Sequence, residues 1–497
     1  MNSGPKFNNI KRNFATRNSM GFDEVINSLQ DQASPIITNV TDNIYYIGFI
    51  VWSINDYLNN TEEKDRTISD MNNHFKIQNF FFTASFLLKD INSTGASGNT
   101  YIRGYVMENK TDTFVYNPNY IETLQTTIGY YRPGLTPLFL LMTETADGES
   151  LKYPHITPYG IELANVFENI IKNTDYFKKY RNSTTVPRSV LLELGNYVNL
   201  NMKNMPTLQK KLYEVLFDNK YNKDYLNNLS LDKDYLLYTT DKYKCNFNEE
   251  IRKILYDYYS PKSLNKALPK ELENTAKIWE IIMGRQYFTI GLSMIWKHVL
   301  NLLDEPMVED KWVEKVRNKI LENIDADETL ESLLSESNYT YEEREEMLKI
   351  GVRQIRSNLL VDGLKVMLSV YNRFDNRKDL TNYHEMFGIN DAYDTIPLVA
   401  FFDSVKKHKK EKTVDYLIMI MKRLIIQNKL IGYKKLQRGK NGYYYEYNNG
   451  YYFKILEYEY DYAGNRMINV YRALEDLDLL GGVNNEWKNI WNTFRKI

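Results

Sequence analysis

The sequence predicts an α+β protein that is predominantly α-helical, and three observations lead to this class. Apolar residues recur three and four positions apart through most of the chain, which is the spacing of one helix face. Strand-like patterns beside turn residues occur in two short places, before Thr157 and around Asn449-Gly450. At 497 residues the chain is too long for one hydrophobic core, so two or three domains are expected.

Two runs in the N-terminal third are apolar on almost every face and predict buried helices. They are Tyr45 to Ile54 and Ile77 to Leu88, and an amphipathic stretch with Val25, Ile26 and Leu29 precedes them. These helices would form the core beneath the unit that follows. Neither run reaches the ~18 apolar residues that a membrane-spanning helix needs, so no membrane segment is expected.

The segment from Thr123 to Lys172 predicts a small unit with the order helix, helix, hairpin, helix. The first helix should stop at Arg132-Pro133-Gly134, because proline cannot donate a backbone N–H and glycine tolerates positive φ. A short run from Leu138 to Met142 then enters a hairpin. Its turn is Ala146-Asp147-Gly148, and the chain returns as Leu151 to Ile156.

The last helix of this unit begins at a recognisable cap. Thr157 can accept an N–H at the helix start, and Pro158 suits the first helical position. The expected buried face follows the helical period: Ile161, Ala164, Phe167 (or Glu168) and Ile171.

A hairpin followed by "ITPYGIELANVF" resembles the wing and final helix of many bacterial winged-helix domains. The resemblance implies contact with DNA, and the basic residues nearest the turn and the wing are Arg132 and Lys152. The alternative is a small α+β module that only packs against its neighbours or forms a dimer.

The stretch "DINSTGASGNTYIRGY" contains Gly95, Gly98 and Gly104 and invites comparison with a phosphate-binding loop. A Walker loop has four residues between its glycines and then a lysine after a strand, whereas here the gap is two residues and Asn99 stands in place of the lysine. We therefore expect a flexible loop for a substrate or partner.

Helical patterns with short breaks continue from Pro187 to Asp304. The longest, Lys277 to Leu303, carries a broad apolar stripe of Ile281, Phe288, Leu292, Ile295, Val299 and Leu302. We expect an N-terminal domain over residues 1–185, a central helical domain over 186–400 and a C-terminal domain over 401–497. A linker near Ser335 to Thr340 would suit a further boundary.

Charge is strongly polarised along the second half of the chain. Asp304 to Glu346 holds 15 acidic and 5 basic residues, whereas Val405 to Gly442 holds 12 basic and 2 acidic residues. The net charge of −1 for the whole chain hides this difference. The acidic tract keeps apolar residues at helical spacing, which predicts solvated helices rather than a disordered tail.

The basic tract predicts a helix capped by Thr413, with Gly432 just past its end. Its buried face would hold Leu417, Met421, Leu424 and Ile431. Beyond it, Asn449-Gly450 is a strong type I′ hairpin signal between tyrosine-rich strands.

Cations beside exposed aromatic rings are the combination that contacts phosphates and stacks bases. This tract therefore predicts a nucleic-acid surface, most simply for DNA. The alternatives are a solvated lysine face or a docking site for an acidic partner, including the chain's own Asp304 to Glu346 segment. The predicted contacts are Lys406, Lys407, Lys409, Lys410, Lys422, Arg423, Lys434, Lys435, Arg438, Lys440, Tyr445 and Tyr447.

The sequence signals for an enzyme are weaker than those for nucleic-acid binding. Two loose triplets could hold Mg²⁺ in a nuclease: Asp304, Glu309 and Lys311, and Asp56, Glu62 and Lys64. The five histidines show no pair at ligand spacing, and the single cysteine excludes a thiolate cluster, so no zinc site and no cofactor are predicted. A protein without catalysis of its own is favoured over a metal-dependent nuclease.

The N-terminal sequence "SLQDQASPIITNVTDNIYYIGFIVWSINDY", with "STGASGNT" and "ITPYGIELANVFE", resembles large uncharacterised bacterial proteins of mobile-element and anti-phage defence loci. The resemblance implies a cytoplasmic subunit that binds DNA and acts with a partner enzyme in a complex. A scaffold whose opposed charges dock protein partners is the third possibility.

Overall fold

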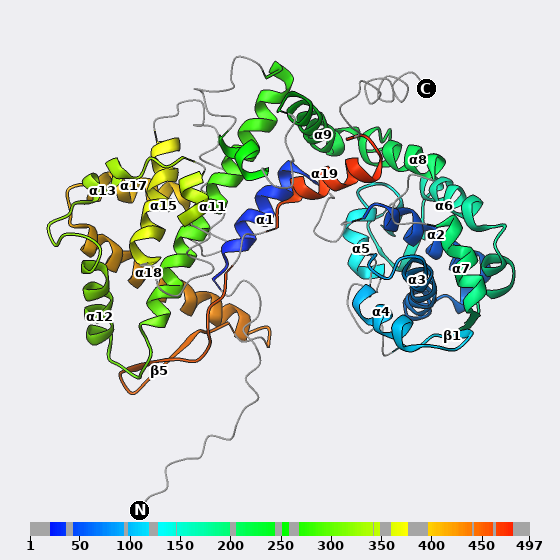
Figure 1. Cartoon of the computed structure of the whole chain (residues 1–497), viewed down its shortest axis with the longest axis horizontal. Helices are drawn as coiled ribbons and strands as arrows, with labels where there is room; N and C mark the ends of the chain where they lie inside the picture. Colours follow the sequence, from blue (N-terminus) through cyan, green and yellow to red (C-terminus); the bar gives the residue numbers. More distant parts are fainter. Residues whose placement is uncertain are drawn as a thin grey trace, which may run out of the picture. The chain divides into compact units, whose positions relative to one another are not determined.

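The structure is a computed structural model, and it describes residues 20–35, 43–93, 98–118, 128–145, 147–198, 205–243, 251–257, 268–340, 342–347, 359–375, 396–439, 442–460 and 464–480. These residues are predominantly helical and include three two-stranded antiparallel sheets, which confirms the predicted class (Figure 1).

The chain divides into two compact units, each built from separate segments. Unit 1 contains Met1–Gln30, Arg252–Leu268 and Ala276–Ala463, and unit 2 contains Asp31–Ile251, Pro269–Thr275 and Gly464–Ile497. These bounds differ from the three consecutive domains that the sequence predicts, and residues 335–340 fall inside unit 1.

Unit 2 is a helical assembly centred on two buried helices. Its helices are α2 (Tyr45–Asn60), η1 (Glu63–Asp65), α3 (Ile68–Lys89), α4 (Asn99–Glu108), α5 (Ile128–Leu135), α6 (Pro158–Ile171), η4 (Tyr176–Tyr180), α7 (Arg188–Tyr197), α8 (Pro206–Phe217), α9 (Lys223–Tyr243), η7 (Lys270–Leu272) and α19 (Arg466–Asp476). The α2 helix packs against α6 and α3, and α3 packs against α7.

Aromatic rings fill the space between these helices. The ring centroids of Trp52 and Phe167 are 5.4 Å apart, and those of Phe49 and Phe82 are 4.8 Å apart. All four side chains are almost completely buried. The two buried helices predicted around 45–54 and 77–88 are therefore confirmed, and each extends further than its apolar run.

Two small sheets lie in unit 2. Strand β1 (Thr113–Val115) pairs with β4 (Thr185–Pro187), and β2 (Leu141–Glu144) forms a hairpin with β3 (Ser150–Ile156). Gly148 adopts φ 81° in the turn between β2 and β3. The predicted first hairpin is therefore confirmed.

The predicted helix stop at Arg132-Pro133-Gly134 is wrong, because α5 contains all three residues and ends at Leu135. Pro133 lies about one turn from the helix start, so its missing N–H removes a single intrahelical bond near one end. That cost is small enough for the helix to continue.

The predicted start of α6 is confirmed, whereas its buried face is partly wrong. The Thr157 hydroxyl accepts the Gly160 N–H at 3.0 Å, and Pro158 is the first helical residue. Ile161 is 41% exposed, and Leu163 is buried instead. Ala164, Phe167 and Ile171 are buried as predicted.

The predicted flexible loop around Gly98 is partly helical. Gly98, with φ 75°, stands directly before α4, and Gly104 lies within this helix. The Ser93 carbonyl accepts bonds from Asn99 Nδ2 and from Arg103 Nη2, each at 2.7 Å. Residues 94–97 lie outside the described part.

Unit 1 is organised around a long central helix. Its elements are most of α1 (Phe22–Ala33), η6 (Lys253–Asp257), most of α11 (Glu273–Asn301), α12 (Glu309–Leu321), α13 (Leu330–Glu336), α15 (Leu359–Phe374), α17 (Leu398–His408), α18 (Thr413–Leu436), β5 (Tyr445–Asn448) and β6 (Tyr451–Lys454). Ile281, Phe288, Leu292, Ile295 and Val299 of α11 are fully buried, which confirms five residues of the predicted core stripe, whereas Leu302 is half-buried just past the helix end.

Two predictions about the ends of α18 are wrong. Thr413 does not cap the helix with its side chain; its backbone N–H instead donates to the Glu328 carbonyl at 2.8 Å. Gly432 lies inside the helix, which continues to Leu436. A Cβ at Gly432 would lie 2.6 Å from the ring of Tyr443, so the glycine permits a close approach rather than a helix end.

The predicted second hairpin is confirmed. Asn448 and Tyr451 are paired, which leaves Asn449 and Gly450 as a two-residue turn with φ values of 51° and 85°. Positive φ at both positions is the mark of a type I′ turn.

Candidate functional site

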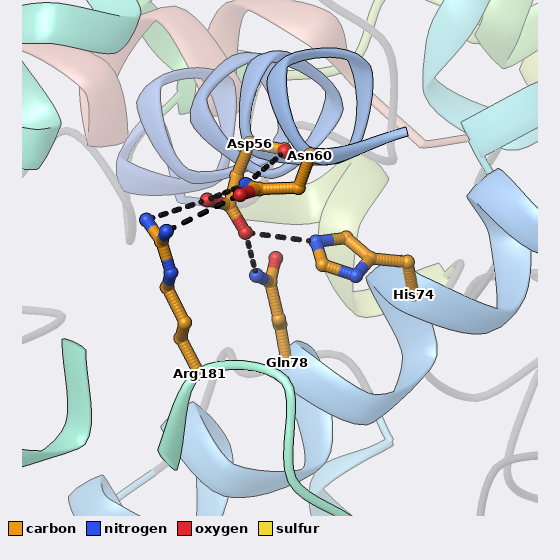
Figure 2. Close-up of polar contacts among 5 residues, drawn as sticks. All are labelled: Asp56, Asn60, His74, Gln78 and Arg181. Carbon is orange, nitrogen blue, oxygen red and sulfur yellow. Dashed lines mark hydrogen bonds and ion pairs between the residues drawn. The ribbon is translucent and has the colours of Figure 1, made fainter. Parts of the chain in front are cut away.

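A buried carboxylate in unit 2 collects polar side chains from three parts of the chain (Figure 2). Asp56 on α2 is 2% exposed. Its Oδ2 accepts bonds from His74 Nε2 at 3.0 Å and Gln78 Nε2 at 2.9 Å, both from α3. Its Oδ1 accepts bonds from Asn60 Nδ2 at 3.0 Å and Arg181 Nη1 at 3.2 Å.

Each partner is placed by helical spacing or by its own packing. Asn60 follows Asp56 by one turn on α2, and Gln78 follows His74 by one turn on α3. Arg181 comes from the turn directly after η4. Its guanidinium lies 4.7 Å from the centroid of Phe177 and also donates to Asn60 Oδ1 at 3.2 Å.

Two further polar atoms in this region have no hydrogen-bond partner among the described residues. They are the hydroxyl of Tyr176, whose side chain is fully buried, and Oε1 of Gln78. Burial, and then the nearby Asp56 carboxylate, raises the pKa of Tyr176 above its ordinary value. This phenol therefore stays neutral.

The Asp56–His74 pair fixes the histidine in one orientation. Because a carboxylate only accepts, Nε2 of His74 carries a proton, and the other ring nitrogen points away from Asp56 (Figure 2). This is the geometry of an oriented general base. However, no described hydroxyl or thiol is bonded to His74, whose side chain is 17% exposed. The arrangement best explains how α2, α3 and the turn after η4 are held together.

The predicted metal triplets do not assemble. Glu62 pairs with Lys64 at 2.8 Å on the surface, while Asp56 is enclosed in its own cluster. Asp304 pairs with Lys315 at 2.5 Å rather than meeting Glu309. Among the residues that the structure describes, no group of three acidic, histidine or cysteine side chains could hold a metal ion.

The acidic and basic tracts of unit 1 contact each other directly. At the backbone, the Leu330 N–H donates to the Glu411 carbonyl at 3.0 Å and the Glu331 N–H donates to the Lys409 carbonyl at 2.9 Å. Side-chain ion pairs add to these bonds: Arg317 with Asp415 at 2.8 Å, Lys412 with Asp327 at 2.7 Å, and Lys422 with Glu309 at 4.0 Å. Part of the basic tract thus binds the chain's own acidic segment, as one of the sequence-based alternatives proposed.

The predicted contact residues of the basic tract therefore differ in exposure and in whether they already have a partner within the chain. Lys406 is paired with Asp375 at 2.6 Å, and the Lys409 ammonium lies 5.8 Å from the centroid of Tyr371. Lys434 is exposed and Lys435 is half-buried. The exposed cations of the tract without an ion-pair partner among the described residues are Lys407, Lys410, Arg423, Lys429 and Arg438.

The two predicted stacking tyrosines differ sharply in exposure. Tyr447 is 63% exposed, whereas Tyr445 is 5% exposed and its hydroxyl donates to the Ile425 carbonyl at 2.9 Å. The expectation that Tyr445 stacks on a base is therefore wrong. Residues two apart on a strand share a face, but only the one nearer the strand start lies over the core.

The remaining predicted contacts are in unit 2 or outside the described part. Arg132 on α5 and Lys152 on β3 are both exposed. Lys440 lies outside the described residues.

The Asp56 cluster was missed by the sequence reasoning, although the sequence carries a signal for it. Asp56 interrupts a nearly continuous apolar helix, and a buried charge requires a partner. His74 and Gln78 likewise lie four positions apart in an apolar setting. The position of Arg181, 125 residues from Asp56, has no sequence signal.

Comparisons with protein-family models, with curated proteins and with solved structures find no match to this chain. Within the described residues, none of the helices is long and apolar enough to cross a membrane.

Proposed function

We propose that the protein binds nucleic acid through the exposed face of α18 from Met419 onward and the turn just after the helix, which we call the α18 strip. The strip consists of Met419, Arg423, Ile426, Lys429, Leu430, Tyr433, Lys434, Leu436 and Arg438.

The observation that carries this proposal is the combination of unpaired cations and an exposed tyrosine ring on α18 and in the turn directly after it. Arg423, Lys429 and Arg438 are exposed and have no ion-pair partner among the described residues. Tyr433 of α18 is 58% exposed. Unpaired cations can neutralise phosphates without first breaking an internal ion pair.

The strip suits a single strand better than a duplex. Three apolar residues lie between the cations: Ile426, Leu430 and Leu436 are 48%, 43% and 58% exposed. Bases of a single strand offer apolar faces to such side chains and stack on tyrosine, whereas a duplex presents mainly phosphate and sugar. The binding preference should therefore be for single strands.

The same apolar side chains favour a second candidate function, which is docking of an acidic amphipathic protein segment. A contiguous exposed apolar surface marks an interaction site more often than a scattered one does. Its basic edges would select an acidic partner. This candidate corresponds to the protein scaffold among the sequence-based alternatives.

The winged-helix-like reading of residues 123–172 remains part of the proposal as a separate surface. In this hypothesis the α5 helix, the β2–β3 hairpin and α6 would serve as helix, wing and final helix, and Arg132 and Lys152 are exposed there. Participation in a cytoplasmic bacterial defence or mobile-element complex, with a partner enzyme, rests on the sequence resemblance alone.

Fluorescence anisotropy with a labelled single-stranded oligonucleotide tests the proposal. Changing Arg423, Lys429 and Arg438 together to Ala should weaken binding on the order of tenfold or more at low salt. The matched control changes Lys406, Lys412 and Lys422 to Ala; these lysines are already paired, so binding should change little. Equal losses in the two variants, or no binding by the unaltered chain, would reject the proposal.

A further inference from the structure

Arg285 in α11 is a fully buried arginine with an incomplete set of partners. Its exposed fraction is 0%. Nη1 donates to the Ile396 carbonyl at 2.9 Å, and the guanidinium carbon lies 5.1 Å from the centroid of Phe288. Nε and Nη2 have no hydrogen-bond partner among the described residues. The guanidinium is thus held at one corner while its opposite edge is free.

The Nε–Nη2 edge is the one with which arginine commonly binds an oxyanion. Nε and Nη2 point in the same direction and match the two oxygens of a carboxylate or phosphate. Arg252 in this unit shows the filled form: its Nε donates to Glu345 Oε1 at 3.0 Å and its Nη2 to Glu345 Oε2 at 2.6 Å. At Arg285 the same pair of donors has no acceptor in the part of the chain that the structure describes.

A second unsatisfied donor lies one turn further along the same helix. Thr289 follows Arg285 by four positions, is 5% exposed, and its hydroxyl has no partner among the described residues. Ser293, the next residue in this row, is satisfied by the hydroxyl of Tyr458 at 3.0 Å. Arg285 and Thr289 thus place unsatisfied polar groups one helical turn apart on α11.

No described acidic side chain offsets the Arg285 charge. Burial lowers the pKa of Arg285 to about 10, which still leaves the guanidinium charged at neutral pH. An unpaired buried charge is costly to a fold, and buried charges are normally paired. In addition, α17 begins just after Ile396 without a side-chain cap or an acid in its first turn, so its positive end is uncompensated.

We propose that Arg285 and Thr289 form a binding site for a small oxyanion, a phosphate or a carboxylate, in the core of unit 1. The Nε and Nη2 donors of Arg285 hold two oxygens of the anion, and the Thr289 hydroxyl supplies a third donor. Complete burial excludes a nucleic-acid backbone as the ligand, so this site is distinct from the α18 strip.

Calorimetric unfolding of the full chain tests the site with phosphate and acetate, each compared with chloride at equal ionic strength. We expect the preferred anion to raise the unfolding temperature of one transition on the order of 5 °C at a hundred times its Kd. A response to phosphate alone identifies a phosphate site, and a response to acetate identifies a carboxylate site. Acid denaturation followed by ion chromatography detects an anion that is already bound.

Three variants make the result specific. Arg285→Met replaces the buried charge by an apolar chain of similar length and should fold but lose the anion response. Arg285→Lys keeps the charge and should also lose most of the response, because lysine lacks the two parallel N–H donors of the guanidinium. Lys407→Met removes an exposed cation and should keep the full response. The proposal is overturned if the unaltered chain releases no oxyanion and shows no anion-dependent shift, or if Arg285→Met retains the shift.

Discussion

At the scale of single residues, Asp56 shows how a charge can remain inside an apolar core. Four side-chain donors converge on its two oxygens, and one of them carries the opposite charge. Removing one member of such a buried pair costs more than the pair itself contributes, because the remaining groups lose their partner. The cluster therefore makes unit 2 sensitive to a change of one atom.

Asp56→Asn should lower the free energy of unfolding of unit 2 by about 3 kcal/mol. The amide would place a donor opposite the donors of His74, Gln78 or Arg181. Urea unfolding followed by circular dichroism measures the effect. Glu62→Gln is the matched control: its surface pair with Lys64 is highly exposed, so a change within about 0.5 kcal/mol is expected. Equal effects of the two substitutions would contradict the structural role of the cluster.

Asp476, at the end of α19, should give unit 2 an unusual pH dependence. Burial raises the pKa of its carboxyl to about 7, although the Ile44 N–H donates to it at 3.2 Å. Because the folded-state pKa lies above the unfolded value, the stabilisation is complete below about pH 4 and is lost as pH rises towards 7. The loss is at most about 4 kcal/mol.

Asp476→Asn keeps an oxygen for the Ile44 N–H and cannot ionise. We expect the variant to be more stable than the unaltered chain at pH 8 and to lose the fall in stability between pH 4 and 7. Urea unfolding at pH 5 and pH 8 measures both. A variant with the same pH dependence as the unaltered chain would show that Asp476 does not titrate in this range.

The sequence could predict residues whose role follows from a local period, and it failed where distant segments decide. Leu417, Met421 and Leu424 are buried as predicted, because helical spacing alone places them on one face. Tyr445 looked like an exposed base-stacking ring, yet Trp296 and Trp312 lie beside it. Their positions along the chain give no hint of that contact.

At the scale of elements, two glycines allow α11 and α15 to approach closely. A Cβ at Gly363 would lie 2.6 Å from the Gly291 carbonyl oxygen, and a Cβ at Gly291 would lie 2.6 Å from the Gly363 carbonyl oxygen. Both obstacles are backbone atoms, which cannot turn aside as a side chain can. The two helices must separate if either glycine gains a side chain.

Gly363→Ala should therefore destabilise unit 1 by roughly 1–3 kcal/mol, despite the better helix propensity of alanine. Gly104→Ala in α4 is the matched control, since a Cβ there would meet nothing within 4 Å. That change should stabilise unit 2 by about 0.5–1 kcal/mol. Thermal unfolding of both variants decides: a stabilising Gly363→Ala would mean that the helices do not cross so closely.

The same distinction explains which helix ends could be predicted. Thr157 before α6 acts as a cap because its partner, Gly160, is three residues away. The start of α18 depends instead on a bond to Glu328, far away in sequence. Gly432 was predicted to end this helix, but the glycine is there because the Tyr443 ring packs closely against it. Capping rules apply to the local chain, so tertiary contacts can override them.

At the scale of the whole molecule, composition indicated the class but not the division of the chain. Each unit collects segments from both halves of the sequence. Composition and turn signals act over a few residues, so they cannot show that residues 464–480 join the unit that begins at Asp31. The same holds for the charged tracts. The sequence showed that acidic and basic residues are separated along the chain, and the structure shows that the two tracts form ion pairs within unit 1.

The salt dependence of single-strand binding tests the central claim most directly, because it counts the phosphates that the α18 strip neutralises. For three contacts from Arg423, Lys429 and Arg438, the slope of log K against log salt should be steeper by about 2 for the unaltered chain than for the triple alanine variant. Anisotropy titrations over a range of salt concentrations give both slopes. Identical slopes for the two proteins would contradict the account.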